Sequence, residues 1–201
     1  RSTLFPYTTL FRSGSWPILI ACVLMLWHSM RPGEACNIEL SDFNWDTLSI
    51  RIQDKPHLNW KPKNLSSYRD IPINTDTNEE IGLDIKNYLL ERYKHAKELQ
   101  TPFICFYEDD GRQLTEGVLA LMIVKLKKKP GSRLSDKFTA HKLRRAFITK
   151  GGDEGELLKT GIIAGHSSIK TTQDDYYSMT MSEEKKAMKK ISFPVRFKSS
   201  K

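Results

Sequence analysis

The chain has 201 residues, of which 39% are hydrophobic, so it can fill one packed core and suits a single domain. It carries 32 lysines and arginines against 24 aspartates and glutamates, a formal net charge of +8. An enzyme that acts on small molecules does not need an excess of positive charge, whereas a surface that binds nucleic acid does. The cysteines Cys22, Cys36 and Cys105 form no CxxC pair and no secreted disulfide framework, which favours a reducing cytoplasm.

The N-terminal segment differs from the rest of the chain. Residues Thr3–Ser13, TLFPYTTLFRS, resemble the conceptual translation of a sequencing-library adapter. We therefore expect residues 1–15 to be non-native and leave them out of the predicted fold. This interpretation implies that the coding sequence is truncated on its 5′ side.

The first predicted elements are two helices and a small sheet. The apolar run Ile18–Trp27 is far shorter than the roughly 20 residues of a membrane span, so it predicts a buried helix, placed at Trp16–Ser29. A second helix is predicted from Pro32 to about Leu40, because proline fits the first turn of a helix. Three runs rich in isoleucine, tryptophan and tyrosine predict antiparallel strands: Thr47–Ile52, Leu58–Lys63 and Tyr68–Ile73.

The second half of the chain predicts mainly helices. Thr77–Glu80 has the spacing of a capping box, and the apolar residues after it recur at helical steps: Ile81, Ile85, Leu89, Tyr93 and Ala96. A brief extended segment is expected at Phe103–Tyr107. The fold class expected is mainly α with a small three-stranded antiparallel sheet, an α+β fold.

Five more helical segments are predicted toward the C-terminus. One runs from Thr115 to a lysine run that Pro130 and Gly131 stop. The next two are a helix from Thr139 that Gly151 and Gly152 end and one marked by Leu157, Leu158, Ile162 and Ile163. The last two are a turn-and-helix unit that Gly165 and His166 open and that bears Tyr176, and a short helix at Ser182–Ile191.

Four short signatures carry charged or nucleophilic side chains: MRPGEA, PKNLSSYRDIPI, HKLRRAF and GHSSIKTTQDDYY. The residues singled out in them are Arg31, Lys63, His141, Arg144, His166 and Tyr176. Arginine suits phosphodiester binding because its planar fork can hold two phosphate oxygens. Histidine and lysine exchange protons, and tyrosine supplies a nucleophile.

Taken in this order, the signatures resemble the tyrosine recombinases, the phage integrase family, from about Trp16 to the end of the chain. The resemblance implies the catalytic-domain fold of that family, which we expect over residues 16–192, followed by a basic tail at residues 193–201. It also implies that Arg31 and Arg144 clamp the phosphate. Glu34 matches a family acidic position that steadies the first arginine.

The resemblance further implies the roles of the remaining residues. His141 would accept the tyrosine proton, and Lys63 would protonate the departing 5′ oxygen. His166 would donate a hydrogen bond to the phosphate. Tyr176 would form a 3′-phosphotyrosyl intermediate, which stores the bond energy for rejoining.

Two of these assignments have close competitors in the sequence. Lys61 competes with Lys63, although the PK…SS.R.IP spacing favours Lys63. Tyr177 competes with Tyr176, which lies ten residues after His166, one of two spacings common in the family.

Two positions depart from the family pattern. Ser29 stands two residues before Arg31, where the family usually has a glycine. Ala164 stands before Gly165 and His166, where a leucine is common.

The function implied is site-specific recombination of double-stranded DNA, with self-association into a tetrameric synapse and no cofactor, metal or membrane. A type IB topoisomerase-like enzyme and a catalytically impaired, truncated DNA-binding integrase fragment are the alternatives. The sequence has no HExxH, no phosphate-binding glycine loop and no acidic cluster of a two-metal nuclease. A metal site built from His141, His166 and the cysteines lacks ligand spacing.

Overall fold

The computed structural model describes residues 16–75, 77–78, 83–128, 136–168 and 170–172. The helices are α2 Trp16–Trp27, α3 Pro32–Cys36, α4 Ile85–Glu98, α5 Glu116–Lys127, α6 Ala140–Asp153 and α7 Leu157–Ala164. The strands are β1 Phe43–Asn44, β2 Ser49–Ile52, β3 Arg69–Pro72, β4 Thr77–Asn78 and β5 Leu83–Asp84, and short 3-10 turns lie at η1 Leu40–Asp42, η2 Pro56–Leu58 and η3 Leu65–Ser67. A mainly helical fold with a small antiparallel sheet is thus confirmed.

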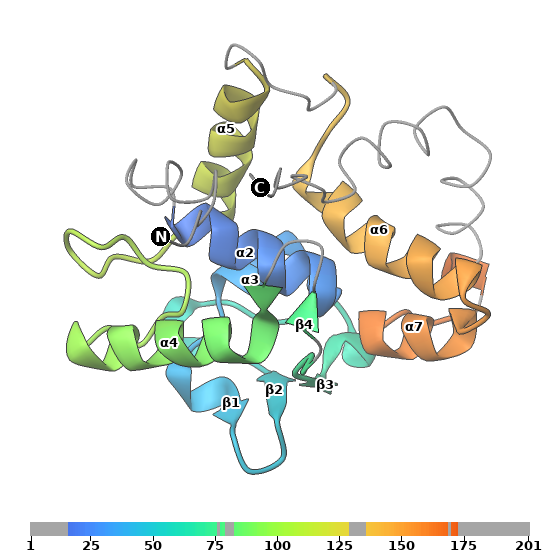
Figure 1. The fold of residues 1–201 in the computed structure, drawn as a ribbon, viewed down its shortest axis with the longest axis horizontal. Helices are drawn as coiled ribbons and strands as arrows, with labels where there is room; N and C mark the ends of the chain where they lie inside the picture. Colours follow the sequence, from blue (N-terminus) through green and yellow to red (C-terminus); the bar gives the residue numbers. More distant parts are fainter. Residues whose placement is uncertain (1–15, 76, 79–82, 129–135, 169, 173–201) are drawn as a thin grey trace, which may run out of the picture.

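Helix α2 lies at the centre of the hydrophobic core. Its residues Ile20, Leu24 and Met25 are fully buried, and it packs against α3 and α6. Figure 1 shows it in the middle of the molecule, with the sheet below it and α6 and α7 to one side. The apolar run therefore forms a buried core helix, as predicted. Within the described part of the chain, no helix is both long and apolar enough to cross a membrane.

The three-stranded sheet has the order β1-β2-β3, with antiparallel pairs throughout. Ile50 pairs with Phe43 on one side and with Ile71 on the other, and all three side chains face the core. The strand predicted at Leu58–Lys63 is wrong. Pro56 begins a 3-10 turn there, and Asn59 follows it in the left-handed conformation, so the chain doubles back within a few residues.

The start of α4 also differs from the prediction. Thr77 and Asn78 form β4, which pairs with β5, so the predicted capping box does not open this helix. Asp84 caps α4 instead, because its carboxylate accepts a hydrogen bond from the Asn87 backbone N–H at 2.8 Å. The apolar stripe that follows is confirmed from Ile85 onward; Ile81 lies outside the described residues.

Helix α3 is shorter than predicted, since it ends at Cys36 and η1 Leu40–Asp42 follows after a break. The helix predicted from Thr115 is confirmed as α5, with the Thr115 hydroxyl accepting from the Val118 backbone N–H. The extended segment expected at Phe103–Tyr107 forms no named strand; its Phe103 and Phe106 each make one isolated β-bridge.

Helices α6 and α7 pack closely against each other. The predicted end of α6 at two glycines is wrong, because the helix continues through them to Asp153. A Cβ atom on Gly151 would lie 1.9 Å from Thr160 Oγ1 of α7. Gly151 therefore allows α6 and α7 to pack closely, because a side chain at this position would clash with Thr160. The helix predicted at Ser182–Ile191 and the predicted segments 1–15 and 193–201 lie outside the described residues.

Candidate active site

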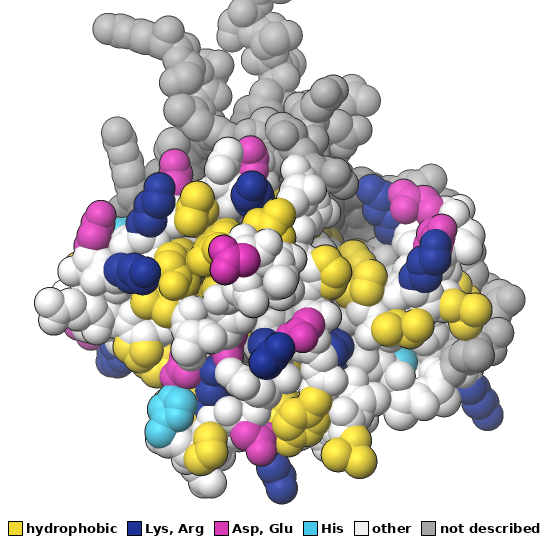
Figure 2. All heavy atoms as spheres, turned by 90° about the horizontal axis from the view of Figure 1, so that it is seen from below, with side chains coloured by type: hydrophobic (Ala, Val, Ile, Leu, Met, Phe, Trp, Pro, Cys, Tyr) yellow, Lys and Arg dark blue, Asp and Glu magenta, His cyan; other side chains and the backbone are white. Residues whose placement is uncertain are grey.

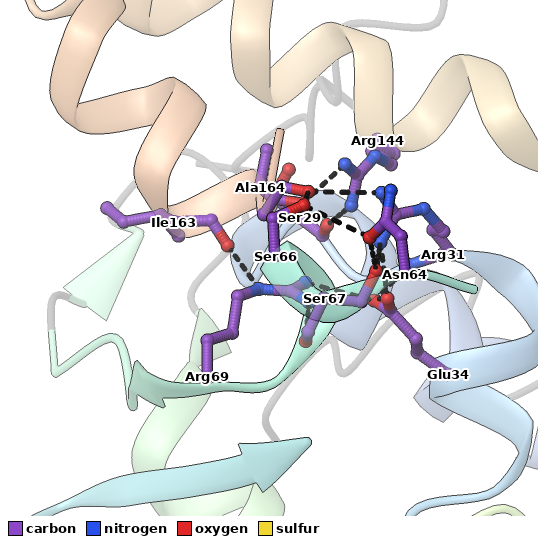
Figure 3. Close-up of polar contacts among 11 residues, drawn as sticks. Ser29, Arg31, Glu34, Asn64, Ser66, Ser67, Arg69, Arg144, Ile163 and Ala164 are labelled. Atoms are coloured by element: carbon purple, nitrogen blue, oxygen red, sulfur yellow. Dashed lines mark hydrogen bonds and ion pairs between the residues drawn. The ribbon is translucent and has the colours of Figure 1, made fainter. Parts of the chain in front are cut away.

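Three arginines meet at the C-terminal turn of α7 (Figure 3). This helix ends at Ala164, and Gly165 caps it in the left-handed conformation with φ 67°. Three consecutive carbonyls each accept a hydrogen bond from a different arginine: Ile163 O from Arg69, Ala164 O from Arg144 and Gly165 O from Arg31. The last carbonyls of a helix carry the negative end of its dipole, so this turn attracts cations. His166 is the next residue in the chain.

Arg31 and Glu34 form an ion pair at the start of α3. Glu34 is 2% exposed, and its carboxylate accepts from the Arg31 backbone N–H at 2.8 Å and from Arg31 Nη1 at 2.6 Å. The Arg31 side chain is 21% exposed. Burial alone raises the pKa of Glu34, but hydrogen bonds and charges from Arg69 and Arg31 outweigh it and hold that pKa below its ordinary value. The carboxylate is therefore ionised at neutral pH.

Arg69, at the start of β3, was not predicted as a site residue. Its Nη2 donates to Glu34 Oε2 at 2.9 Å and its Nη1 to Glu34 Oε1 at 3.2 Å. Its Nε donates to Ile163 O at 2.7 Å, and the side chain is 9% exposed. The only sequence signal for it was its place in the signature that contains Lys63, because its partners Glu34 and Ile163 lie 35 and 94 residues away along the chain.

Arg144 reaches the same turn from α6. It is 5% exposed, and its two terminal nitrogens donate to the carbonyls of Ser29 and Ala164. Ser29 has φ 52°, in the left-handed region that glycine adopts without steric cost. This is the position at which the tyrosine recombinases usually have glycine. The departure in the sequence thus leaves a serine in a conformation that costs roughly 1–2 kcal/mol.

Lys63 lies in the loop that precedes η3. It is exposed, and so is its competitor Lys61. The next residue, Asn64, accepts hydrogen bonds from the hydroxyls of Ser66 and Ser67. Lys63 therefore stands one residue from a segment with fixed geometry.

The same segment is joined to the arginines. Ser67 Oγ accepts from Arg31 Nη1 at 3.0 Å, and Ser66 Oγ shares its one hydrogen between Asn64 Oδ1 and Gly165 O, the latter at 3.1 Å. A Cβ atom on Gly165 would lie 2.7 Å from Ser66 O, so only glycine fits between α7 and η3. The loop with Lys63 and the turn with His166 are thus held side by side.

The two predicted histidines belong to elements that also carry partners of this cluster, α6 and the turn after α7. His141 is exposed in the first turn of α6, one turn before Arg144. His166 is half-buried, with Nδ1 at 3.0 Å from Thr172 Oγ1, and its backbone N–H donates to Gly161 O. Tyr176 and its competitor Tyr177 lie outside the described residues.

A model of the phage integrase family matches residues 8–183, which include every signature singled out above. The chain belongs to the phage integrase family. The resemblance seen in the sequence is therefore confirmed for the family and for the fold. No curated protein sequence matches the chain.

Solved structures of integrases share the fold. A lambda integrase (75–356) dimer bound to a COC′ core site is 19% identical, with a TM-score of 0.62 over 85% of this chain and 55% of that chain. XerA recombinase is 20% identical, with a TM-score of 0.59 over 89% of this chain and 58% of that chain. The Tn1549 transposon integrase (aa 82–397, Y379F) in complex with transposon right end DNA is 21% identical, with a TM-score of 0.55 over 88% of this chain and 64% of that chain. The chain thus spans between half and two thirds of each of these relatives.

The described part of this integrase-family site carries three guanidinium groups and one carboxylate, a formal charge of +2. Figure 2, seen from below, shows a face on which basic and acidic side chains are mixed with hydrophobic patches. Among the described residues, no three His, Cys, Asp or Glu side chains gather closely enough to hold a metal ion. What the arrangement offers is a concentrated positive charge suited to an anion.

Proposed function

We propose that this chain is the catalytic domain of a site-specific DNA recombinase, which cleaves and rejoins strands through a 3′-phosphotyrosyl intermediate. The supporting observation is the convergence of Arg31, Arg69 and Arg144 on one turn, next to His166, with Glu34 paired to the first two of these arginines. A phosphodiester is an anion whose paired oxygens match the guanidinium fork. The proposed partner is double-stranded DNA in the cytoplasm, on which four copies of the protein would assemble.

Arg31 and Arg144 are the proposed ligands of the two nonbridging phosphate oxygens. A guanidinium group has five N–H donors. Within the described residues, Arg31 uses three of them, on Glu34, Ser67 and Gly165. Two N–H groups remain for a phosphate, and the side chain is partly exposed to solvent. Binding of this kind places positive charge where charge builds up in the transition state.

The proposed cleavage step moves two protons. A tyrosine hydroxyl has a pKa near 10, so ionising it beforehand at pH 7 would cost about 4 kcal/mol. His141 would instead take the proton as the Tyr176 oxygen attacks phosphorus. The bond from phosphorus to the 5′ oxygen then breaks, and Lys63 would protonate the leaving oxygen. His166 would donate to a phosphate oxygen, with Thr172 Oγ1 orienting its ring.

Covalent trapping on a nicked suicide duplex tests the nucleophile. We expect the intact chain to accumulate a protein–DNA adduct and Tyr176→Phe to form none, because only the phenolic oxygen is removed. Tyr177→Phe is the matched control and should trap normally. Trapping should also survive EDTA. An adduct formed by Tyr176→Phe would move the nucleophile, a magnesium requirement would indicate a nuclease, and no adduct with the intact chain would contradict the activity.

The choice between Lys63 and Lys61 is tested through the leaving group. Lys63→Ala should slow cleavage of the normal duplex far more than Lys61→Ala does. A substrate with sulfur in place of the bridging 5′ oxygen leaves without a proton, because a thiol has a pKa of about 8.5. It should therefore restore cleavage by Lys63→Ala. Rescue of Lys61→Ala alone would reverse the assignment.

A further inference from the structure

We propose that Arg69 is a positioning residue that leaves the positive charge of Arg31 available to the scissile phosphate, because Arg69 offsets the negative charge of Glu34. This inference rests on the proposed function, in which Arg31 binds the phosphate. It adds a residue to which the sequence analysis gave no role, and it gives the buried Glu34 a defined effect on phosphate binding.

The Glu34 carboxylate lies between two arginines and is fully hydrogen-bonded. Its Oε1 accepts from Arg31 Nη1 at 2.6 Å and from Arg69 Nη1 at 3.2 Å. Its Oε2 accepts from the Arg31 backbone N–H at 2.8 Å and from Arg69 Nη2 at 2.9 Å. Arg69 therefore grips both oxygens with its fork, whereas the Arg31 side chain contacts only one. The bidentate partner stabilises more of the carboxylate charge.

Arg69 is placed to act through Arg31 rather than on DNA. Its Nε donates to Ile163 O at 2.7 Å and its Nη1 to Ser67 O at 2.7 Å, so backbone atoms of α7 and η3 fix the guanidinium. The side chain is 9% exposed, compared with 21% for Arg31. Figure 3 shows Arg69 on the opposite side of the Ser67 segment from Arg144.

The charge balance gives the physical reason. Glu34 is 2% exposed, so solvent screens its charge weakly and nearby groups feel it strongly. With Arg31 as its only side-chain partner, Glu34 would form a neutral pair and cancel the attraction for phosphate. With Arg69 added, the three groups carry a net positive charge. The charge of the partly exposed Arg31 is then available to the phosphate, while Glu34 still holds the Arg31 side chain in place.

The experiment measures how the affinity for a short DNA duplex changes with salt, since the slope of log K against log salt counts the phosphates neutralised. Four variants are compared with the intact chain: Arg69→Met, Arg69→Lys, Glu34→Gln and Arg69→Met with Glu34→Gln. The range runs from about 50 to 200 mM salt. Circular dichroism melting fixes a temperature at which every variant is folded, and suicide-duplex trapping is a second readout.

Charge sharing predicts a specific pattern. Arg69→Met should lower the slope by about 0.9, one phosphate, although Arg69 does not reach the DNA. It should also slow trapping by on the order of 10²-fold, as when one donor to a developing negative charge is lost. Adding Glu34→Gln should restore the slope, because the uncompensated carboxylate is gone. Arg69→Lys keeps a positive charge beside Glu34 and should lower the slope by less than Arg69→Met does, and Glu34→Gln alone should not lower it.

A purely structural role for Arg69 would give a different result. Arg69→Met would then melt earlier with an unchanged slope, or the double variant would show the same reduced slope as Arg69→Met, and either result overturns the inference. If Arg69→Met does not fold, the inference is overturned instead when the salt slope of Arg69→Lys or of the double variant falls by about 0.9, the equivalent of one phosphate. Arg31→Met separates this inference from the proposed function: an unchanged slope there means that Arg31 does not bind phosphate at all.

Discussion

Two buried clusters of charged side chains in this chain have opposite balances. In the Glu34 cluster, one carboxylate faces Arg31 and Arg69. In the second cluster, named here the Lys55 cluster, Lys55 Nζ lies 2.5 Å from Asp42 Oδ1 and 3.0 Å from Glu39 Oε2. His57 and Gln53 complete it through contacts with the same two carboxylates.

The ratio of positive to negative side chains distinguishes a cluster that stabilises the fold from one that can bind a ligand. Lys55 is 4% exposed and both carboxylates contact its ammonium group, so the second cluster leaves no positive charge for an anionic ligand and fastens η1 to the loop after β2. The Glu34 cluster keeps a surplus of positive charge next to a partly exposed arginine. Burying excess positive charge costs free energy, and an anionic ligand that binds next to it offsets that cost.

The largest expected effect comes from breaking the Lys55 cluster. Lys55→Met leaves two buried carboxylates without their cation, so we expect the free energy of unfolding in urea to fall by about 3–5 kcal/mol. The salt dependence of DNA binding should stay the same. Arg51→Met, which breaks the exposed pair with Asp70, is the control and should cost little. A changed salt slope in folded Lys55→Met would contradict the division into two kinds of cluster.

Acid should affect the two regions in different pH ranges. His28, in the turn beside Arg31, is fully buried; burial lowers its pKa from 6.5 to about 4, against a backbone hydrogen bond to Val23 that raises it. The unfolded chain binds a proton below pH 6.5 and the folded chain only below about 4, so stability falls as pH drops through this window. At about 1.36 kcal/mol per pKa unit, the loss is about 3 kcal/mol.

The Lys55 cluster responds only at lower pH. Burial raises the pKa of Glu39, but hydrogen bonds from His57 and Lys55 outweigh it, so the pKa lies below the ordinary 4.5. Its stabilisation is present above pH 4.5 and is lost as pH falls through the lowered value. Urea unfolding from pH 7 to 4 should therefore show a steep loss that His28→Gln flattens. Equal slopes for both proteins would rule out His28 as the cause.

Packing between α6 and α7 positions the turn whose carbonyls bind the arginines of the Glu34 cluster. Gly151→Ala forces a Cβ atom against Thr160, so we expect a loss of about 1–3 kcal/mol on thermal unfolding. DNA binding should weaken as well, since α7 carries the carbonyls that hold the arginines. Gly117→Ala in α5 is the matched control: nothing lies within 4 Å of its Cβ, and it should stabilise the helix slightly. Similar losses for both would show that packing is not the cause.

The smallest expected effect concerns backbone strain in the two regions. Ser29→Gly should stabilise the protein by about 1 kcal/mol, because glycine adopts the left-handed conformation freely. Asn59, near Lys55, has φ 50°, but asparagine tolerates this region, so Asn59→Gly should change the melting temperature less. A destabilised Ser29→Gly would show that the serine side chain contributes more than its strain costs.

The helices were largely predictable because apolar periodicity and end signals are local. The run of α2, the Thr115 cap of α5 and the stripe of α4 from Ile85 onward were read correctly from neighbouring residues. The strands were harder. A two-residue strand such as β1 has almost no pattern of its own, and the segment Leu58–Lys63 was predicted to be extended although Pro56 and Asn59 turn the chain.

The sequence by itself determined the family and the residues to examine, because each signature is a short run whose chemistry is visible in order. Only the tertiary structure decided how they meet. Arg31 and Gly165 lie 134 residues apart, and Arg69 and Glu34 lie 35 apart. Many of the partners are backbone carbonyls, which every residue possesses and which therefore leave no mark in a sequence. The charge surplus of the site thus became visible only when folding brought three arginines to the end of one helix.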